Sequence, residues 1–368
     1  MLLRMKARFA LALLPLAAST LLHCGGTSDG GLPSAPAPVA DTRPADAAPV
    51  ADGGAPDDAT ASDASPAPLA RMGRARSLFA AVSAKDGRIR AFGGLSIVGL
   101  DGTTEAYDPA SNTWTDSTAD GSTRRYTHAA AEDSAGRVYV LGGTSDGKTP
   151  IATVEAYSPT DDAWAPIADL PTARLGLAAA VGKDGRLYAI GGRAATGAPT
   201  DVVEVYSPTT KAWSVAPSLP TKRLALVAVT GADGKIYALG GRDANNEPLA
   251  DVEAFDVDKG AWESVEPLST ARYWFGATLG ADGRIYALGG IGKLGFLDSV
   301  EAFTPASGWK VQKAMPEPRG WLSAAASADG KVFAIGGGAP SDDGPAAQQP
   351  PPVSTMLAFD TKTSLWKR

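Results

Sequence analysis

Cysteine and histidine are nearly absent from this 368-residue chain. It has one cysteine, Cys24, and two histidines, His23 and His128. A zinc or copper site built from histidine and cysteine ligands cannot be assembled around His128 alone. A Ser-His-Asp triad would also have to use His128, and no nucleophile-elbow pattern supports one. We therefore expect no metal, no cofactor and no catalytic residue of these kinds.

The chain also lacks an excess of positive charge. It has 34 Lys and Arg against 40 Asp and Glu, a formal net charge of −6. Residues 1–24 carry +3 and residues 25–68 carry −6, which leaves −3 for residues 69–368. Because binding to nucleic acid needs a concentrated basic surface, nucleic acid is not an expected partner.

The first 24 residues are typical of an export signal. Arg4, Lys6 and Arg8 precede the apolar residues 9–22, a stretch too short to span a bilayer. Cys24 follows and resembles the acceptor cysteine of bacterial lipoproteins, although His23 stands where a small residue is usual. We expect a protein held at the outer membrane or cell surface only through lipidated Cys24. The alternative is a periplasmic or secreted protein.

Residues 25–68 differ in composition from the rest of the chain. They are rich in Ala, Pro, Asp, Gly and Ser and contain no aromatic residue. Such a segment buries too little apolar surface to offset the entropy lost on ordering. We predict a disordered tether there and a folded domain over residues 69–368.

The sequence of the predicted folded domain contains six repeats of one unit. Double glycines begin at Gly93, Gly142, Gly191, Gly240, Gly289 and Gly336, at spacings of 49, 49, 49, 49 and 47 residues. An arginine precedes each pair: Arg76, Arg125, Arg174, Arg223, Arg272 and Arg319. A tryptophan follows each pair: Trp114, Trp164, Trp213, Trp262, Trp309 and Trp366. A period near 50 residues indicates an array of supersecondary units.

Each unit contains the pattern of four short strands. In the third unit they cover residues 174–181, residues 186–190, residues 202–206 and the surroundings of Trp213. Asp184-Gly185 between the first two predicts a hairpin with a type I′ turn. Four short strands cannot bury two faces alone, but six copies arranged radially can.

The repeat resembles the kelch repeat over residues 69–368. The resemblance rests on the double glycine ending strand two, the Val154-Glu155-Ala156-Tyr157 pattern of strand three and the tryptophan of strand four. It implies an all-β, six-bladed β-propeller with four antiparallel strands per blade, each blade contiguous in sequence. How the ring closes stays open. The copper oxidases that share this fold need a tyrosine–cysteine crosslink and histidine ligands, which this chain lacks.

Residues that break the repeat are the candidates for function. Four aromatic residues have no counterpart in the repeat and lie one or two residues after its arginine: Tyr126, Tyr273, Trp274 and Trp321. In kelch propellers that bind peptides, the residue after this arginine and the residue after the double glycine line the binding face. The resemblance therefore adds Arg193 and Arg242. Aromatic faces suit sugar rings and arginines suit carboxylates.

Each of these candidates has a structural alternative. Trp274 and Trp321 could plug the central channel or pack between blades, and Arg193 and Arg242 could be solvated loop charges. His128 replaces core leucine or phenylalanine of the other units and is expected to be a packed, hydrogen-bonded histidine.

The repeat arginines have partners in the sequence. Five units carry a glutamate on strand three: Glu105, Glu155, Glu204, Glu253 and Glu301. We expect Arg–Glu pairs or arginine bonds to carbonyl groups; the alternative is a ring of arginines that attracts an acidic ligand. The sixth unit has Leu357 instead, so Arg319 is the arginine expected to be free for a ligand. That unit also carries a proline-rich insertion, either a flap beside Trp321 or a tolerated surface loop.

We predict a monomeric, non-enzymatic recognition module at the cell envelope, binding a glycan or protein segment at the propeller mouth. One alternative is a sugar-modifying enzyme like the sialic-acid mutarotase of the kelch family, with His128 or a loop carboxylate as base. The other is a structural envelope protein.

Overall fold

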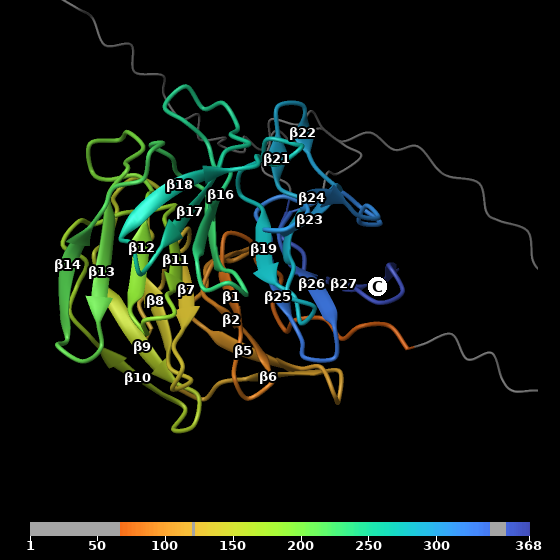
Figure 1. Cartoon of the computed structure of the whole chain (residues 1–368). Coiled ribbons are helices and arrows are strands. Elements are labelled where there is room, and N and C mark those ends of the chain that lie inside the picture. Colours follow the sequence, from red (N-terminus) through yellow and green to blue (C-terminus); the bar gives the residue numbers. More distant parts are fainter. Residues whose placement is uncertain (1–66, 120–121, 339–350) are drawn as a thin grey trace, which may run out of the picture. The chain divides into compact units, whose positions relative to one another are not determined.

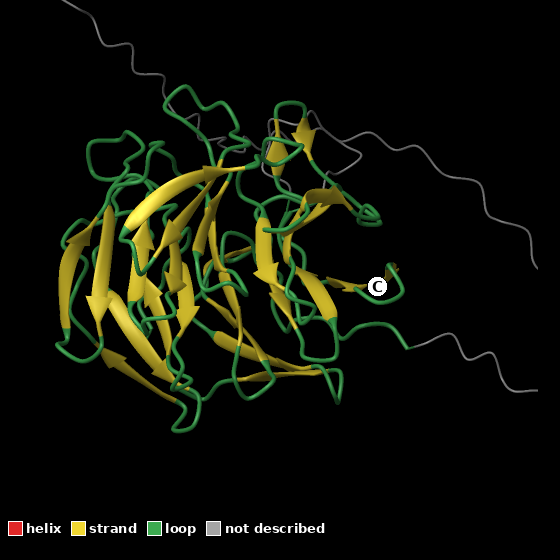
Figure 2. Cartoon of the chain, viewed as in Figure 1, coloured by secondary structure: helices red, strands yellow, loops and turns green. Residues whose placement is uncertain are grey.

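The computed structural model describes residues 67–119, 122–338 and 351–368, which belong to one compact unit. The predicted signal with Cys24, the predicted tether up to residue 66 and residues 339–350 of the sixth-unit insertion lie outside the described residues. The described residues form strands and loops (Figure 2). Among them we find no helix long and apolar enough to cross a membrane.

Six four-stranded antiparallel sheets form the blades (Figure 1). Blade one contains β1 (Ala80–Ser83), β2 (Ile89–Phe92), β5 (Thr104–Asp108) and β6 (Thr113–Asp116). Blade two contains β7 (Ala129–Glu132), β8 (Val138–Leu141), β9 (Val154–Ser158) and β10 (Ala163–Pro166). Blade three contains β11 (Ala178–Val181), β12 (Leu187–Ile190), β13 (Val203–Ser207) and β14 (Ala212–Ala216).

The second half of the ring repeats this order. Blade four contains β15 (Val227–Thr230), β16 (Ile236–Leu239), β17 (Val252–Asp256) and β18 (Ala261–Val265). Blade five contains β19 (Gly276–Leu279), β20 (Ile285–Leu288), β23 (Val300–Thr304) and β24 (Gly308–Val311). Blade six contains β25 (Ser323–Ala326), β26 (Lys331–Ile335), β27 (Met356–Asp360) and β28 (Leu365–Lys367). The predicted six-bladed, all-β propeller with contiguous blades is confirmed.

Two small hairpins extend from blades one and five. The first pairs β3 (Leu95–Ser96) with β4 (Gly99–Leu100), and the second pairs β21 (Ile291–Gly292) with β22 (Gly295–Phe296). Each follows a double glycine, on the same face as the start of strand one. We call this the mouth face.

The first strand of each blade is shorter than the sequence predicted. Strand β11 begins at Ala178, four residues after Arg174, because Gly176 has a φ of +61° and interrupts the extended backbone. The predicted type I′ turn at Asp184-Gly185 is also wrong, since Gly185 alone has positive φ. Its amide donates to Gly182 O at 2.9 Å, which fits a type I turn followed by a left-handed glycine.

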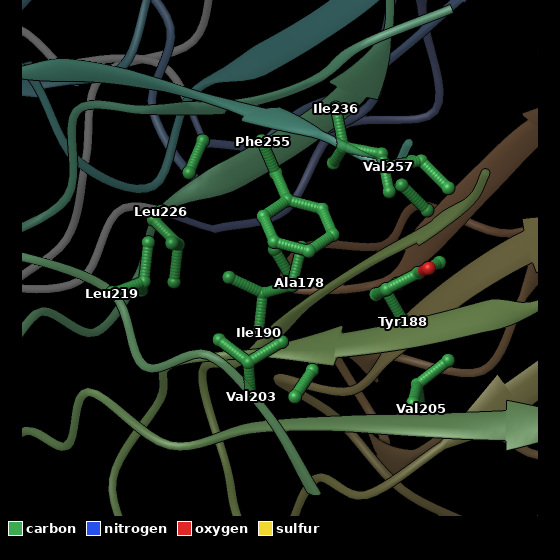
Figure 3. Packing of buried hydrophobic residues seen from close by; sticks show 13 residues of the cluster. Ala178, Tyr188, Ile190, Val203, Val205, Leu219, Leu226, Ile236, Phe255 and Val257 are labelled. Atoms are coloured by element: carbon green, nitrogen blue, oxygen red, sulfur yellow. The ribbon is translucent and has the colours of Figure 1, made fainter. Parts of the chain in front are cut away.

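The hydrophobic core lies between neighbouring blades. Second strands are the most buried, and all four residues of β12 are buried. Between blades three and four, Phe255 packs against Tyr188, with ring centroids 5.6 Å apart, and Leu226 lies in the same cluster (Figure 3). Because each cluster takes residues from two blades, a blade on its own would leave one face of its sheet exposed.

The ring closes without a strand exchanged between the chain ends. Inner strands contact their neighbours in order around the ring, and β25 contacts β1. Gly337 N donates to Arg76 O at 2.9 Å, the bond that every other second glycine makes to the arginine of the next blade. Closure therefore repeats the contact used between all other blades.

The segment before Arg76 serves as the missing linker of blade six. Leu69 N donates to Arg368 O and Met72 N to Ser354 O, both at 2.9 Å. Met72 is 3 % exposed and occupies the place that linker residues such as Leu170 take after other blades. The similarity of residues 69–76 to residues 167–174 was the signal for this role in the sequence.

Replacing Met72 with alanine should therefore weaken the seam between blades six and one. We expect the free energy of unfolding to fall by about 2–4 kcal/mol, because a buried side chain is lost and a cavity remains. Chemical denaturation measures the change. Leu365→Ala, at a residue that is 55 % exposed on β28, is the control and should cost less than about 0.5 kcal/mol. Equal losses in the two variants would contradict this role for Met72.

Candidate functional site

The six repeat arginines are structural. Each is at most 1 % exposed and donates through Nη1 to the carbonyl oxygen of the first glycine in its blade. Five form buried ion pairs with Glu105, Glu155, Glu204, Glu253 and Glu301, as the sequence predicted. Burial lowers the pKa of Arg174 from its ordinary value, and the facing carboxylate opposes that shift.

The expectation that Arg319 is free of a partner is wrong. Its guanidinium is fully buried and pairs with Glu317, two residues before it in the chain. Arg319 Nη2 also donates to Thr355 Oγ1 at 2.7 Å, and Nη1 to Thr355 O at 2.9 Å. Glu317 thus takes the part that the strand-three glutamate plays elsewhere, and we remove Arg319 from the candidate site.

A closed ring of backbone hydrogen bonds surrounds the channel on the mouth face. One residue per blade contributes, two positions after the repeat arginine: Leu78, Thr127, Gly176, Ala225, Trp274 and Trp321. Each amide donates to the ring residue of the preceding blade, at 2.7–3.1 Å, and Leu78 N completes the ring at Trp321 O. All six have φ between +47° and +61°.

Two of the predicted aromatic residues belong to this ring. Trp274 and Trp321 hold left-handed backbone conformations that are rare for large residues and are often found at functional sites. The indole of Trp274 reaches toward blade three, where a Cβ on Gly176 would lie 3.1 Å from its Cη2 atom. Trp321 packs edge-to-face against Phe296 of β22, with centroids 5.1 Å apart. Both indoles are partly exposed.

The mouth wall is built from the two predicted sets of residues. In every blade the residue after the arginine forms an isolated β-bridge with the residue after the double glycine. The six bridges are Ser77 with Leu95, Tyr126 with Thr144, Leu175 with Arg193, Leu224 with Arg242, Tyr273 with Ile291 and Gly320 with Gly338. Tyr126 and Tyr273 lie on the strand-one side of this bridge in blades two and five, and Arg193 and Arg242 lie on the other side in blades three and four. We call these four residues the Tyr–Arg arc.

Each arginine of the Tyr–Arg arc contacts a neighbouring blade. Arg193 Nη2 donates to Gly147 O of blade two at 3.2 Å, and a Cβ on Gly147 would collide with Tyr126 Oη. Arg242 stacks over Tyr273, with its Cζ atom 5.3 Å from the ring centroid. Burial raises the pKa of Tyr126, Asp146 adds to the rise and Arg193 opposes it. The phenol therefore stays a hydrogen-bond donor at neutral pH.

Neither arginine of the arc has an ion-pair partner among the described residues. The Nε atoms of Arg193 and Arg242 are buried and have no hydrogen-bond partner among the described residues. Between them the channel ring contributes its smallest members, Gly176 and Ala225. Two planar cations thus lie on adjacent blades, and the indole of Trp274 reaches over Gly176 beside them. Guanidinium groups placed in this way suit carboxylate groups.

A central cavity of about 150 Å³ lies beneath the ring. The channel ring and the inner strands line it, and its lining includes His128 but no carboxylate. His128 is 6 % exposed, and its Nε2 atom lies 3.1 Å from Phe92 O of blade one. Burial, together with the charge of Arg125, lowers the pKa of His128 to about 3. The residue is neutral at physiological pH and packed between blades.

The described residues also bear on two other possibilities: a metal site, and a catalytic site that combines His128 with Arg193 or Arg242. Within ranges 67–119, 122–338 and 351–368, no group of three or more His, Cys, Asp or Glu side chains could hold a metal ion. His128 does not converge with Arg193 or Arg242: its ring faces blade one, whereas the two arginines lie on blades three and four.

The sequence pattern missed the contribution of the second hairpin. Phe296 covers Trp321, and a Cβ on Gly320 would collide with the Phe296 ring. The signal available was the apolar segment at residues 291–296, which departs from the polar loops of blades two to four.

Comparison with known proteins supports the fold. A family model described as the KLHDC2/KLHL20/DRC7 Kelch-repeats domain matches residues 179–368, and a Kelch motif model matches residues 125–171. The F-box/kelch-repeat protein At1g22040 of Arabidopsis thaliana is 29% identical over 94 residues. That match covers 25% of this chain and 19% of the plant protein.

A solved structure extends the likeness over most of the chain. The structure of YjhT matches with a TM-score of 0.66 and 16% sequence identity, covering 82% of this chain and 99% of that one. At this identity the similarity concerns the fold alone. Because the first family model spans more than half of the chain, the protein belongs to the kelch-repeat family.

Proposed function

We propose that the protein is a non-enzymatic recognition module that binds a carboxylate-bearing glycan or protein segment at the Tyr–Arg arc. The observation that carries the proposal is that Arg193 and Arg242 lie on adjacent blades of the mouth face and that neither has an ion-pair partner among the described residues. A fold that places variable loops around a common ring is suited to recognition, and the site decides the ligand. Display at the cell envelope through Cys24 remains part of the proposal and rests on the sequence of residues 1–24.

Loss of either arginine should weaken binding of acidic ligands. Arg193→Gln or Arg242→Gln removes a charged donor, and we expect affinity for a carboxylated probe to fall about 10- to 100-fold. The probes are glucuronic acid, N-acetylneuraminic acid and a glutamate-containing peptide, each measured by calorimetric titration.

The matched control is Arg186→Gln, which removes an exposed arginine at the opposite end of blade three. It should bind as the unmodified protein does. The proposal fails if no carboxylated probe binds, or if binding persists unchanged in both arc variants.

A further inference from the structure

Three aliphatic side chains project into solvent from the two mouth hairpins. Val98 is 90 % exposed, Ile97 75 % and Leu294 100 %. The corresponding loops of blades two and four carry Asp146, Lys148, Asp243 and Glu247 instead. Since those blades fold with polar loops, the apolar residues are not required by the repeat. We call Ile97, Val98 and Leu294 the hairpin tips.

Strand pairing and side-chain contacts hold the two hairpins that carry the tips. In the first hairpin Leu95 pairs with Leu100, and Ser96 Oγ donates to Gly99 O at 3.0 Å. In the second, Ile291 pairs with Phe296, whose ring packs against Trp321. A contact made by such tips costs little ordering entropy, which favours a role in binding.

The apolar surface continues from the Tyr–Arg arc. Tyr273, the last residue of the arc, bridges Ile291 at the base of the second hairpin (Figure 1 shows β21 and β22). Phe296 and Trp321 then carry apolar surface onto blade six, and the first hairpin stands on blade one beyond it. One extended ligand crossing the mouth would meet cations on one side and aliphatic groups on the other.

We propose that the hairpin tips bind apolar side chains of the same partner whose carboxylate occupies the Tyr–Arg arc. The inference rests on the proposed function and narrows it: the partner is a protein segment that combines acidic and large apolar residues, and not a glycan. Burying the aliphatic tips is favourable against an apolar surface, which leucine or phenylalanine supplies and a hydroxyl-covered sugar does not.

A lipid surface fits the charges less well. Insertion of loop tips into an anionic membrane is normally supported by basic residues beside them. Lys293 is the one basic residue within β3–β4 and β21–β22, and it pairs with Glu247 at 3.5 Å. The peptide is therefore the favoured occupant, and vesicles become an arm of the test.

The experiment selects random phage-displayed peptides on the full chain and measures the best binder by titration. Affinity is then compared among the unmodified protein, the double variant Val98→Ser/Leu294→Ser, the double variant Arg193→Gln/Arg242→Gln, and Val215→Ser. Val215 is 82 % exposed on the outer strand β14 and serves as the apolar control away from the mouth. Glucuronic acid and phosphatidylglycerol vesicles are the non-peptide probes.

We expect selected peptides that combine Asp or Glu with Leu, Ile or Phe. Their affinity should fall about tenfold in the tip variant, fall in the arc variant and stay unchanged in Val215→Ser. Arc-dependent binding of glucuronic acid or acidic peptides that ignores the tip substitutions would overturn this inference and leave the proposed function standing. Tip-dependent binding of vesicles without peptide binding would also overturn it. Peptide binding that requires the tips but not the arc would contradict both the proposed function and this inference.

Discussion

Replacing Arg174 with methionine should lower the free energy of unfolding by about 3–5 kcal/mol. Arg174 is fully buried and bonds to Glu204 Oε2 at 2.8 Å, Gly191 O at 2.9 Å and Val202 O at 2.8 Å. The substitution removes a donor from this carboxylate and from four backbone carbonyl groups, those of Thr172, Ala189, Gly191 and Val202. Breaking one side of a buried pair costs far more than the intact pair contributes, because the remaining charge is uncompensated.

Arg186→Met is the matched control for this result. Arg186 lies in the same blade and pairs with Asp184 at 2.5 Å, but its side chain is 42 % exposed. Water can replace its partner, so the cost should stay below about 1 kcal/mol. Denaturant titration of both variants gives the comparison. Similar losses would show that the repeat arginine does not stabilise the blade through its buried pairing.

Replacing His128 with leucine should stabilise the protein and remove one source of acid sensitivity. Five blades carry leucine or phenylalanine at this place, and His128 Nδ1 is buried without a partner. The gain at neutral pH should be about 1 kcal/mol, because an unsatisfied polar atom is removed from the core. Loss of the Nε2 bond to Phe92 O offsets part of the benefit.

The pH dependence separates the titration of His128 from its packing. The pKa of His128 falls from 6.5 to about 3 on folding, so between these values the unfolded chain binds the additional proton. Stability from the neutral imidazole is fully present above pH 6.5 and is lost as the pH falls toward 3. The loss amounts to about 1.4 kcal/mol per pH unit. The difference in free energy of unfolding between His128→Leu and the unmodified protein should therefore grow by about 1.4 kcal/mol for each pH unit below 6.5.

Unfolding free energies of the two proteins at several pH values between 4 and 8 provide the test. The carboxylates titrate in both proteins, so their contributions cancel in the difference. A difference that stays constant with pH would mean that His128 titrates normally in the folded protein, contrary to its burial.

The repeat made much of this architecture predictable. A glycine pair, an arginine and a tryptophan recur because every blade has the same four strands and packs against its neighbours in the same way. That regularity also predicted the role of the arginines, since in five units a glutamate follows the arginine after 29 or 30 residues. The residues left after subtracting the repeat, such as Tyr126 and Tyr273, do lie on the mouth face, because a residue two or fewer positions after the arginine cannot leave it.

Contacts between side chains from different loops could not be predicted in this way. The pairing of Arg319 with Glu317 replaced a missing glutamate from a neighbouring position that no periodic pattern marks. The left-handed backbone of Trp274 and Trp321 follows from the closed hydrogen-bonded ring, which exists only when six blades are assembled. Tryptophan does not favour a left-handed backbone conformation on its own.

The sequence by itself determined the number of blades, their strand order and five of the six buried arginine pairs, because those depend on spacings that repeat along the chain. Tertiary structure decided how Arg193 bonds to Gly147, how Arg242 stacks on Tyr273 and how Phe296 covers Trp321. These contacts join residues of different blades or loops, and their geometry is set by the distance and angle between blades. That geometry is a property of the closed ring, which no single repeat contains.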